Sequence, residues 1–197
     1  EGERGGEDTF EFTHKSFGEY FIALRIMRFL QQMAKERLRR AKSDDEGWSE
    51  EEALEKWAKL CGPAAWDHYL YLFLAREIAA QPKKQVEKWQ QVLVELIGYL
   101  LRQGMPMHLL GLSSFKESVR QSRNAETALL ATLHGCAVHT EERSRVQWPD
   151  SLAFGRWLSY LHGQRNWAYE TDLLSYLSYL AAEGAVLYAK DLSCAQM

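Results

Sequence analysis

The sequence predicts a mainly α-helical protein: an irregular multi-helix domain, with a short N-terminal strand before it and a C-terminal tail of five-residue period after it. Apolar residues recur at three- and four-residue steps through most of the chain, which is the spacing of amphipathic helices. Capping patterns, prolines and glycines divide this pattern into segments, each of the length of one helix. No period of about 30 to 50 residues repeats, so the common helical solenoids are not expected.

The composition is typical of a folded, cytoplasmic protein. Apolar residues make up 46% and aromatic residues 12% of the 197 residues, unlike a disordered chain. The 24 basic and 27 acidic residues leave a net charge of −3, so neither nucleic acid nor an acidic membrane is an expected partner. Three widely spaced cysteines indicate reduced thiols, and no apolar stretch reaches the roughly 20 residues of a membrane span. The acidic, glycine-rich start lacks an initiator Met and the pattern of a signal peptide, so we expect it to be a cut within a longer chain.

The N-terminal part changes from a strand pattern to a helix pattern. Residues 9–13 alternate, with Phe10 and Phe12 on one face, as in a short strand. From Ser16 to about Lys42 the spacing predicts one long amphipathic helix. Its expected apolar stripe consists of Phe17, Tyr20, Leu24, Met27, Leu30, Ala34, Leu38 and Ala41.

Two further helices are predicted after an acidic break. Ser49 and Glu52 have the spacing of a capping box, which predicts a helix that ends at Gly62. The next helix is expected over residues 64–80, because Pro82 stops it. Its apolar face consists of Trp66, Leu70, Phe73, Leu74 and Ile78.

A fourth helix is predicted over about residues 84–103, with Gly104 as its C-terminal signal. A loop over residues 105–113 should follow it. One side of the helix is uniformly apolar, and we expect that side to face the core. This side consists of Val86, Trp89, Val92, Leu93, Leu96 and Leu100.

The helical pattern continues in the second half of the chain. Ser114 and Glu117 form a second capping-box pattern, which predicts a helical stretch with a break near Asn124 and an end near Ala137. A further helix is expected over residues 149–163, because it begins with a proline and ends with a glycine. The total is seven or eight helices of unequal length.

Residues 10–23, with the sequence FEFTHKSFGEYFIA, resemble the segment that follows the nucleotide-binding module in NACHT-type signalling NTPases of the STAND class. In that family the segment joins a winged-helix domain to a helical domain, and its histidine contacts the β-phosphate of ADP in the resting state. His14 occupies the histidine position, whereas Gly18 replaces the usual Gln and Ile22 replaces the first of two Ala. The positions that match and are expected to pack are Phe10, Phe12, Phe17, Glu19, Tyr20 and Ala23.

The tail resembles the start of a pentapeptide-repeat domain, a family that forms a right-handed, square β-helix. In steps of five, Leu177, Ala182, Leu187, Leu192 and Met197 share one register. The resemblance implies that these repeats turn a central Leu or Phe and a small residue two positions earlier toward the core, although Lys190 departs from this pattern. The implied core residues are Ala185, Leu187, Leu192, Ala195 and Met197.

Both resemblances together imply three regions: residues 1–15 as a polar lead with a winged-helix remnant, residues 16–165 as the helical domain, and residues 170–197 as the truncated start of pentapeptide repeats. The implied function is that of a regulatory connecting domain, which couples a nucleotide switch to a C-terminal sensor surface in cytosolic stress or phage defence. The implied partners are proteins: the NTPase module of the same chain, its C-terminal repeats, and further copies in an oligomer. ADP or ATP with Mg²⁺ is expected in the parent protein, an ATPase, and no cofactor in this segment.

The chain itself is not expected to be an enzyme. It contains no GxxxxGK[ST] or GxGxxG loop for phosphates, and no HExxH, GxSxG or CxxC motif. One alternative is an independent helical adaptor for protein–protein interaction, in which the N-terminal motif arises by chance and His14 only caps a helix. A second is a small metal-dependent hydrolase around His134, Cys136 and His139, although this spacing supplies no paired zinc ligands and no metal site is expected.

Two surface features also have plain interpretations. The basic run that includes Arg37 and Arg39 is expected to be the solvated C-terminal end of the long helix, because cations there favour the helix dipole. Trp148, Trp167 and Tyr169 fall near predicted loops and are candidates for interface anchors.

Overall fold

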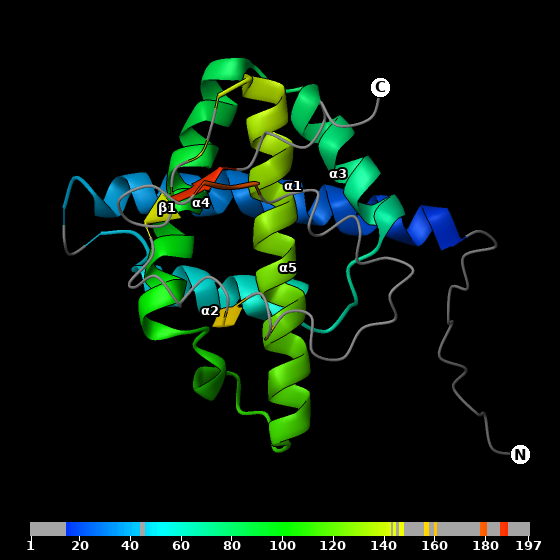
Figure 1. Cartoon of the computed structure of the whole chain (residues 1–197), viewed down its shortest axis with the longest axis vertical. Helices are drawn as coiled ribbons and strands as arrows, with labels where there is room; N and C mark the ends of the chain where they lie inside the picture. The colour runs from blue at the N-terminus through cyan, green and yellow to red at the C-terminus, as the bar shows by residue number, and fades with distance from the viewer. Residues whose placement is uncertain are drawn as a thin grey trace, which may run out of the picture.

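The computed structural model describes residues 15–43, 46–142, 144, 146–147, 156–157, 160, 178–180 and 186–188. Within these residues the protein is mainly α-helical, as predicted (Figure 1). The α-helices are α1 (Lys15–Arg40), α2 (Glu50–Cys61), α3 (His68–Ala79), α4 (Lys83–Gln103) and α5 (Phe115–Thr140), and the 3-10 helix η1 (Met107–Leu110) lies between α4 and α5.

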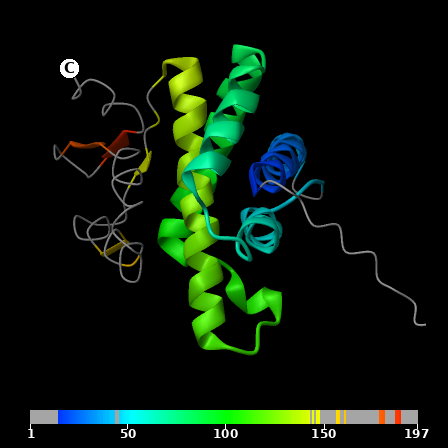
Figure 2. The same cartoon turned by 90° about the vertical axis from the view of Figure 1, so that its right-hand side faces the viewer.

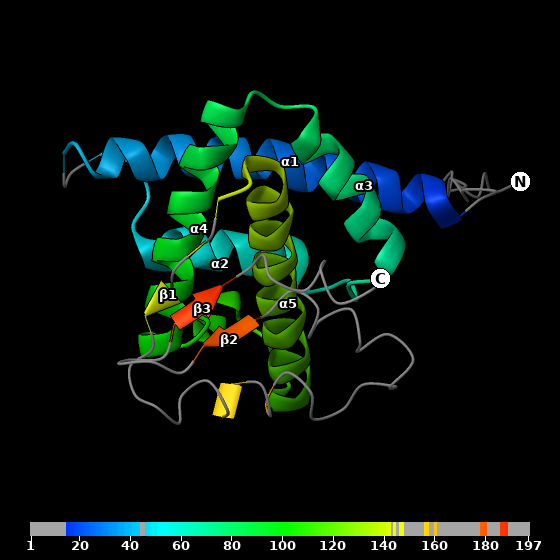
Figure 3. The ribbon, with the colours of Figure 1, turned by 45° about the horizontal axis from the view of Figure 1, so that its top comes forward.

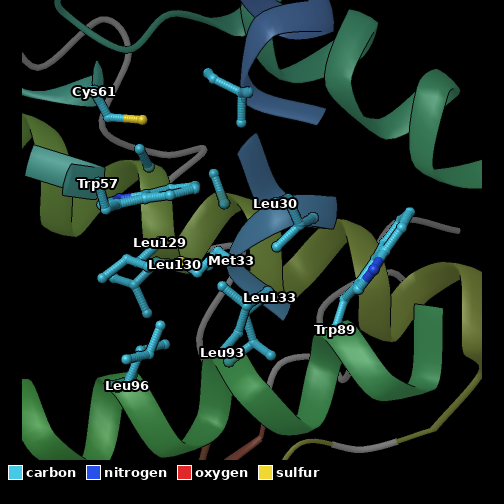
Figure 4. Close-up of a cluster of buried hydrophobic side chains, with 14 of the residues drawn as sticks. Leu30, Met33, Trp57, Cys61, Trp89, Leu93, Leu96, Leu129, Leu130 and Leu133 are labelled. Atoms are coloured by element: carbon cyan, nitrogen blue, oxygen red, sulfur yellow. The ribbon is translucent and has the colours of Figure 1, made fainter. Parts of the chain in front are cut away.

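The helices form two crossed layers. In Figure 2, α1 and α2 are seen nearly end-on in one layer, while α3, α4 and α5 run along the other. The long helix α5 packs against α2, α3 and α4, and α1 packs against α2, α3 and α4. Side chains from segments far apart in the sequence therefore pack into one hydrophobic core, as Figure 4 shows for α1, α2, α4 and α5.

Three short strands lie beside the helices: β1 (Val146–Gln147), β2 (Ser178–Leu180) and β3 (Val186–Tyr188). They form an antiparallel sheet in the order β1-β3-β2 (Figure 3). Leu187 of β3 is opposite both Val146 and Tyr179. The predicted strand over residues 9–13, most of the predicted helix 149–163, and the other predicted core residues Ala185, Leu192, Ala195 and Met197 lie outside the described residues.

The predicted start of α2 is confirmed. The Ser49 hydroxyl accepts a hydrogen bond from the Glu52 backbone N–H at 3.1 Å, and the Glu52 carboxylate accepts one from the Ser49 N–H at 2.9 Å. These bonds satisfy two backbone donors that a helix start leaves without partners. α2 then ends at Cys61, and Gly62 caps it as expected.

α4 also agrees with its prediction, because all six residues of its expected core face are buried. Gly104, with φ 80°, follows its last residue. This backbone angle is one that glycine adopts without a steric penalty. None of the described helices is both long enough and apolar enough to cross a membrane.

The predicted stripe of α1 is correct only in its centre. Leu30 is fully buried, but Phe17 is 55% and Leu38 40% exposed. The predicted stripe has a period of about 3.5 residues, so it drifts across the face of a straight helix of 3.6 residues per turn. The buried residues outside the predicted stripe are Glu19, Ala23, Ile26, Met33 and Arg37, and of these Glu19 and Ala23 were expected to pack as motif residues.

α3 begins at His68, four residues later than predicted, because Asp67 supplies the cap. Its carboxylate accepts a hydrogen bond from the Leu70 backbone N–H at 2.9 Å. The loop predicted over residues 105–113 is interrupted by η1. At the start of α5, the Ser114 hydroxyl caps the Glu117 N–H.

The predicted break near Asn124 is wrong, because α5 is continuous from Phe115 to Thr140. The Asn124 side-chain amide donates to the Gly62 carbonyl oxygen at 2.8 Å, and thus does not compete with the backbone of its own helix. α5 also extends beyond Ala137. The Thr140 hydroxyl donates to the side-chain oxygen of Gln90 on α4 at 2.7 Å, which fixes the last turn.

Candidate functional site

The motif that resembles NACHT proteins runs into the start of α1. His14, Phe10 and Phe12 lie outside the described residues, and α1 begins at Lys15, the residue that follows His14 in the sequence. Of the motif residues within α1, Ala23 is fully buried and Glu19 nearly so. The start of α1 is therefore built into the helical domain.

Tyr20 connects this end of α1 to α3. Its ring meets the ring of Phe73 edge to face, with centroids 5.6 Å apart, a favoured aromatic geometry. Phe17, by contrast, is mostly exposed and does not pack in the core as expected. α1 and α3 together carry five exposed large apolar side chains, which we call the α1/α3 surface: Phe17, Phe21, Ile22, Tyr69 and Leu72.

The opposite end of α1 is anchored by Arg37, which was predicted to be solvated but is only 8% exposed. Its guanidinium donates to the Trp48 carbonyl oxygen at 2.8 Å and forms an ion pair with Glu50 of α2. Glu95 of α4 lies 3.8 Å away. Arg39 behaves as predicted, since its side chain is half exposed and pairs with acidic residues at the surface.

The two histidines near the end of α5 have separate partners, and Cys136 is a buried free thiol. His134 Nδ1 lies 2.7 Å from the Tyr71 hydroxyl, and His139 Nε2 lies 3.0 Å from the Gln81 carbonyl oxygen. Burial lowers the pKa of His134 to about 4 and raises the pKa of Cys136 to about 12. Over the described part of the chain, no three His, Cys, Asp or Glu side chains gather as metal ligands would.

A buried carboxylate that the sequence prediction missed lies in the middle of α5. Glu126 is 4% exposed and accepts hydrogen bonds from the Ser122 hydroxyl at 2.7 Å and from the Trp157 indole N–H at 2.6 Å. Burial raises the pKa of its carboxyl group to about 7, although the two hydrogen bonds and the nearby Arg123 act in the opposite direction. The sequence does hold a signal for this site, since Glu126 is the one acidic residue in a long stretch of small and apolar residues.

The candidate interface anchors Trp148, Trp167 and Tyr169 lie outside the described residues, so their roles remain predictions. Comparison with known proteins assigns no family: no protein-family model matches the chain, and no curated protein or solved structure matches it either.

Proposed function

We propose that the chain is a non-catalytic connecting domain of a NACHT-type signalling NTPase, which couples the nucleotide switch to a C-terminal sensor or interaction surface. The observation that carries the proposal is the course of α1: the motif runs into its first turns, and Arg37 anchors its last turns to α2 and α4. The proposed setting is cytoplasmic, in stress or phage defence.

The length and anchoring of α1 suit it to transmit a displacement. Its 26 residues span about 39 Å at about 1.5 Å per residue. Near the motif, Tyr20 packs on Phe73 of α3, and at the far end Arg37 binds α2. A shift of the motif would therefore move two regions of the core together, because packed helices respond as units.

His14 would contribute the nucleotide-dependent contact in the complete protein. An imidazole N–H can donate a hydrogen bond to a phosphate oxygen in either charge state. A contact that exists only with ADP would favour the resting state by its own interaction free energy. ADP or ATP with Mg²⁺ would bind to the NTPase module and not to this chain.

The test is His14→Leu in the complete protein, with co-purified ADP and basal signalling as readouts. We expect less retained ADP and a higher basal signal. His108→Leu is the matched control, because His108 lies on η1 with its side chain 70% exposed. Unchanged ADP and an unchanged resting signal in His14→Leu would refute the sensor role.

The α1/α3 surface favours a second candidate, an independent adaptor for protein–protein interaction. Large apolar side chains exposed on two packed helices, as on α1 and α3, are candidates for contact with another protein. The surrounding reading frame discriminates between the two candidates: an upstream GxxxxGK[ST] motif in frame supports the NTPase domain, and its absence supports the adaptor.

A further inference from the structure

Glu126 joins α5 to a separate segment of the chain, of which the structure describes Arg156, Trp157 and Tyr160. One carboxylate oxygen accepts from Ser122 of α5, one turn earlier, and the other accepts from Trp157 of the segment. Glu126 and Trp157 are both buried, with 4% and 8% of their surfaces exposed. The carboxylate therefore depends on Trp157 for one of its two hydrogen bonds.

Two further contacts fasten the same segment to α5. The guanidinium of Arg123 lies over the ring of Tyr160, 4.7 Å from its centroid, a cation–π geometry. The Tyr160 hydroxyl donates to the Val119 carbonyl oxygen at 3.4 Å. Contacts over two turns of α5 thus hold Trp157 and Tyr160 in place.

Among the residues that the structure describes, two ionisable groups act on the carboxyl group of Glu126. Arg123 faces it from α5 and favours its charged form, and Tyr160 faces it from the segment. Arg156, the other ionisable residue described in the segment, is exposed. Burial is nevertheless the largest influence and raises the pKa of Glu126 to about 7.

We propose that Glu126 is a protonation-controlled latch, which holds Trp157 and Tyr160 on α5 and releases them more readily when its carboxyl group is ionised. Detachment of the segment would hydrate the carboxylate, and hydration favours the charged form. The closed latch therefore binds a proton more tightly than the open one, and mass action makes opening more frequent as the pH rises. The latch is independent of the function proposed above, because it rests on contacts among described residues alone.

The test measures opening through hydrogen exchange of the Trp157 indole N–H in the whole chain. The resonance is assigned with Trp157→Phe, and the rates are corrected for the pH dependence of chemical exchange. If the open carboxyl group has its ordinary pKa of 4.5 and the closed one a pKa of about 7, the opening constant should be about tenfold larger at about pH 8 than at about pH 6. Equal opening constants would overturn the proposal.

Glu126→Gln separates titration from hydrogen bonding. The Gln amide can still accept from Trp157 and donate to Ser122, but it carries no titrating proton, so the tenfold change should disappear. Glu117→Gln is the control. Glu117 is also a carboxylate of α5, but its side chain is 38% exposed, and hydrogen bonds with Arg120 and Gln121 lower its pKa to about 2. In Glu117→Gln the opening constant should still change tenfold with pH. A tenfold change that persists in Glu126→Gln would overturn the latch.

A second measurement remains decisive if Glu126→Gln fails to fold. The titration of Glu126 can be followed directly by the carbon chemical shift of its carboxyl group, in the native chain and in Trp157→Ala. Removal of the indole should let water reach the carboxylate, so we expect its pKa to fall from about 7 by one unit or more. An unchanged titration would show that Trp157 does not cover the carboxylate and would refute the latch.

Discussion

Replacement of Glu126 by Gln should make global stability less dependent on pH. Folding raises the pKa of this group from 4.5 to about 7. Its contribution to stability is therefore fully present below pH 4.5 and is lost as the pH rises through 7. At about 1.4 kcal/mol per pKa unit, the loss amounts to about 3 kcal/mol, and Gln should remove it.

His134 acts in the opposite direction and has to be separated in the assay. Folding lowers its pKa from 6.5 to about 4, so its contribution is present above pH 6.5 and is lost as the pH falls through 4. The two groups therefore nearly compensate each other between about pH 4.5 and 6.5 in the native chain. In Glu126→Gln the loss of stability that His134 causes as the pH falls should become visible, because Glu126 no longer offsets it.

The assay is urea unfolding of both chains, followed by far-UV circular dichroism, at several pH values from about 4.5 to 8. The difference between the two free energies of unfolding cancels all groups that the chains share. We expect Glu126→Gln to be more stable by up to about 3 kcal/mol at pH 8 and close to the native chain near pH 4.5. A difference that does not vary with pH would refute the reasoning, because it would mean that burial does not disfavour the charge.

Two further substitutions test contacts within the fold, each against a matched control in the same unfolding assay. Arg37→Met should lower stability by about 1–3 kcal/mol, because it leaves the Trp48 carbonyl oxygen without its donor; Arg39→Met, at an exposed ion pair, should cost less than about 1 kcal/mol, and equal losses would contradict the anchor. Gly62→Ala should destabilise by about 1–3 kcal/mol, since its Cβ would lie 2.5 Å from the Ala58 carbonyl oxygen. At Gly98 an added Cβ has room, because its nearest neighbouring atom lies at 3.5 Å, so Gly98→Ala should stabilise α4 by up to about 1 kcal/mol. If Gly98→Ala destabilised the chain more than Gly62→Ala, the close packing described at Gly62 would be contradicted.

The parts of the fold that the sequence predicted well are those fixed by local signals. α4 has one apolar side, a proline before it and a glycine after it, and both its bounds and its buried face agree with the prediction. The capping box of α2 consists of residues three positions apart, so no distant contact was needed to infer it. Such patterns carry their own physical cause.

The parts that could not be predicted depend on partners far away in the chain. Arg37 is part of a basic run and looked solvated, but its partners Trp48, Glu50 and Glu95 come from other elements. Asn124 looked like a helix break, because its acceptor at Gly62 is remote in sequence. Tertiary contacts overrode local preference in both cases.

The candidate site was predictable only in part. The motif residues Tyr20 and Ala23 pack as expected, whereas Phe17 is exposed. Glu126 escaped prediction because its importance depends on Trp157, which lies 31 residues away. A single carboxylate in an apolar stretch indicates burial or a partner but does not identify which.

The most direct test of the central claim is hydrogen–deuterium exchange on the complete protein, with and without ADP, over the first two turns of α1. The coupling proposed for α1 predicts stronger protection of residues 15–23 when ADP is bound. The difference should be lost in His14→Leu and kept in His108→Leu. Equal protection with and without ADP would contradict the claim that this helix couples the nucleotide switch to the domain.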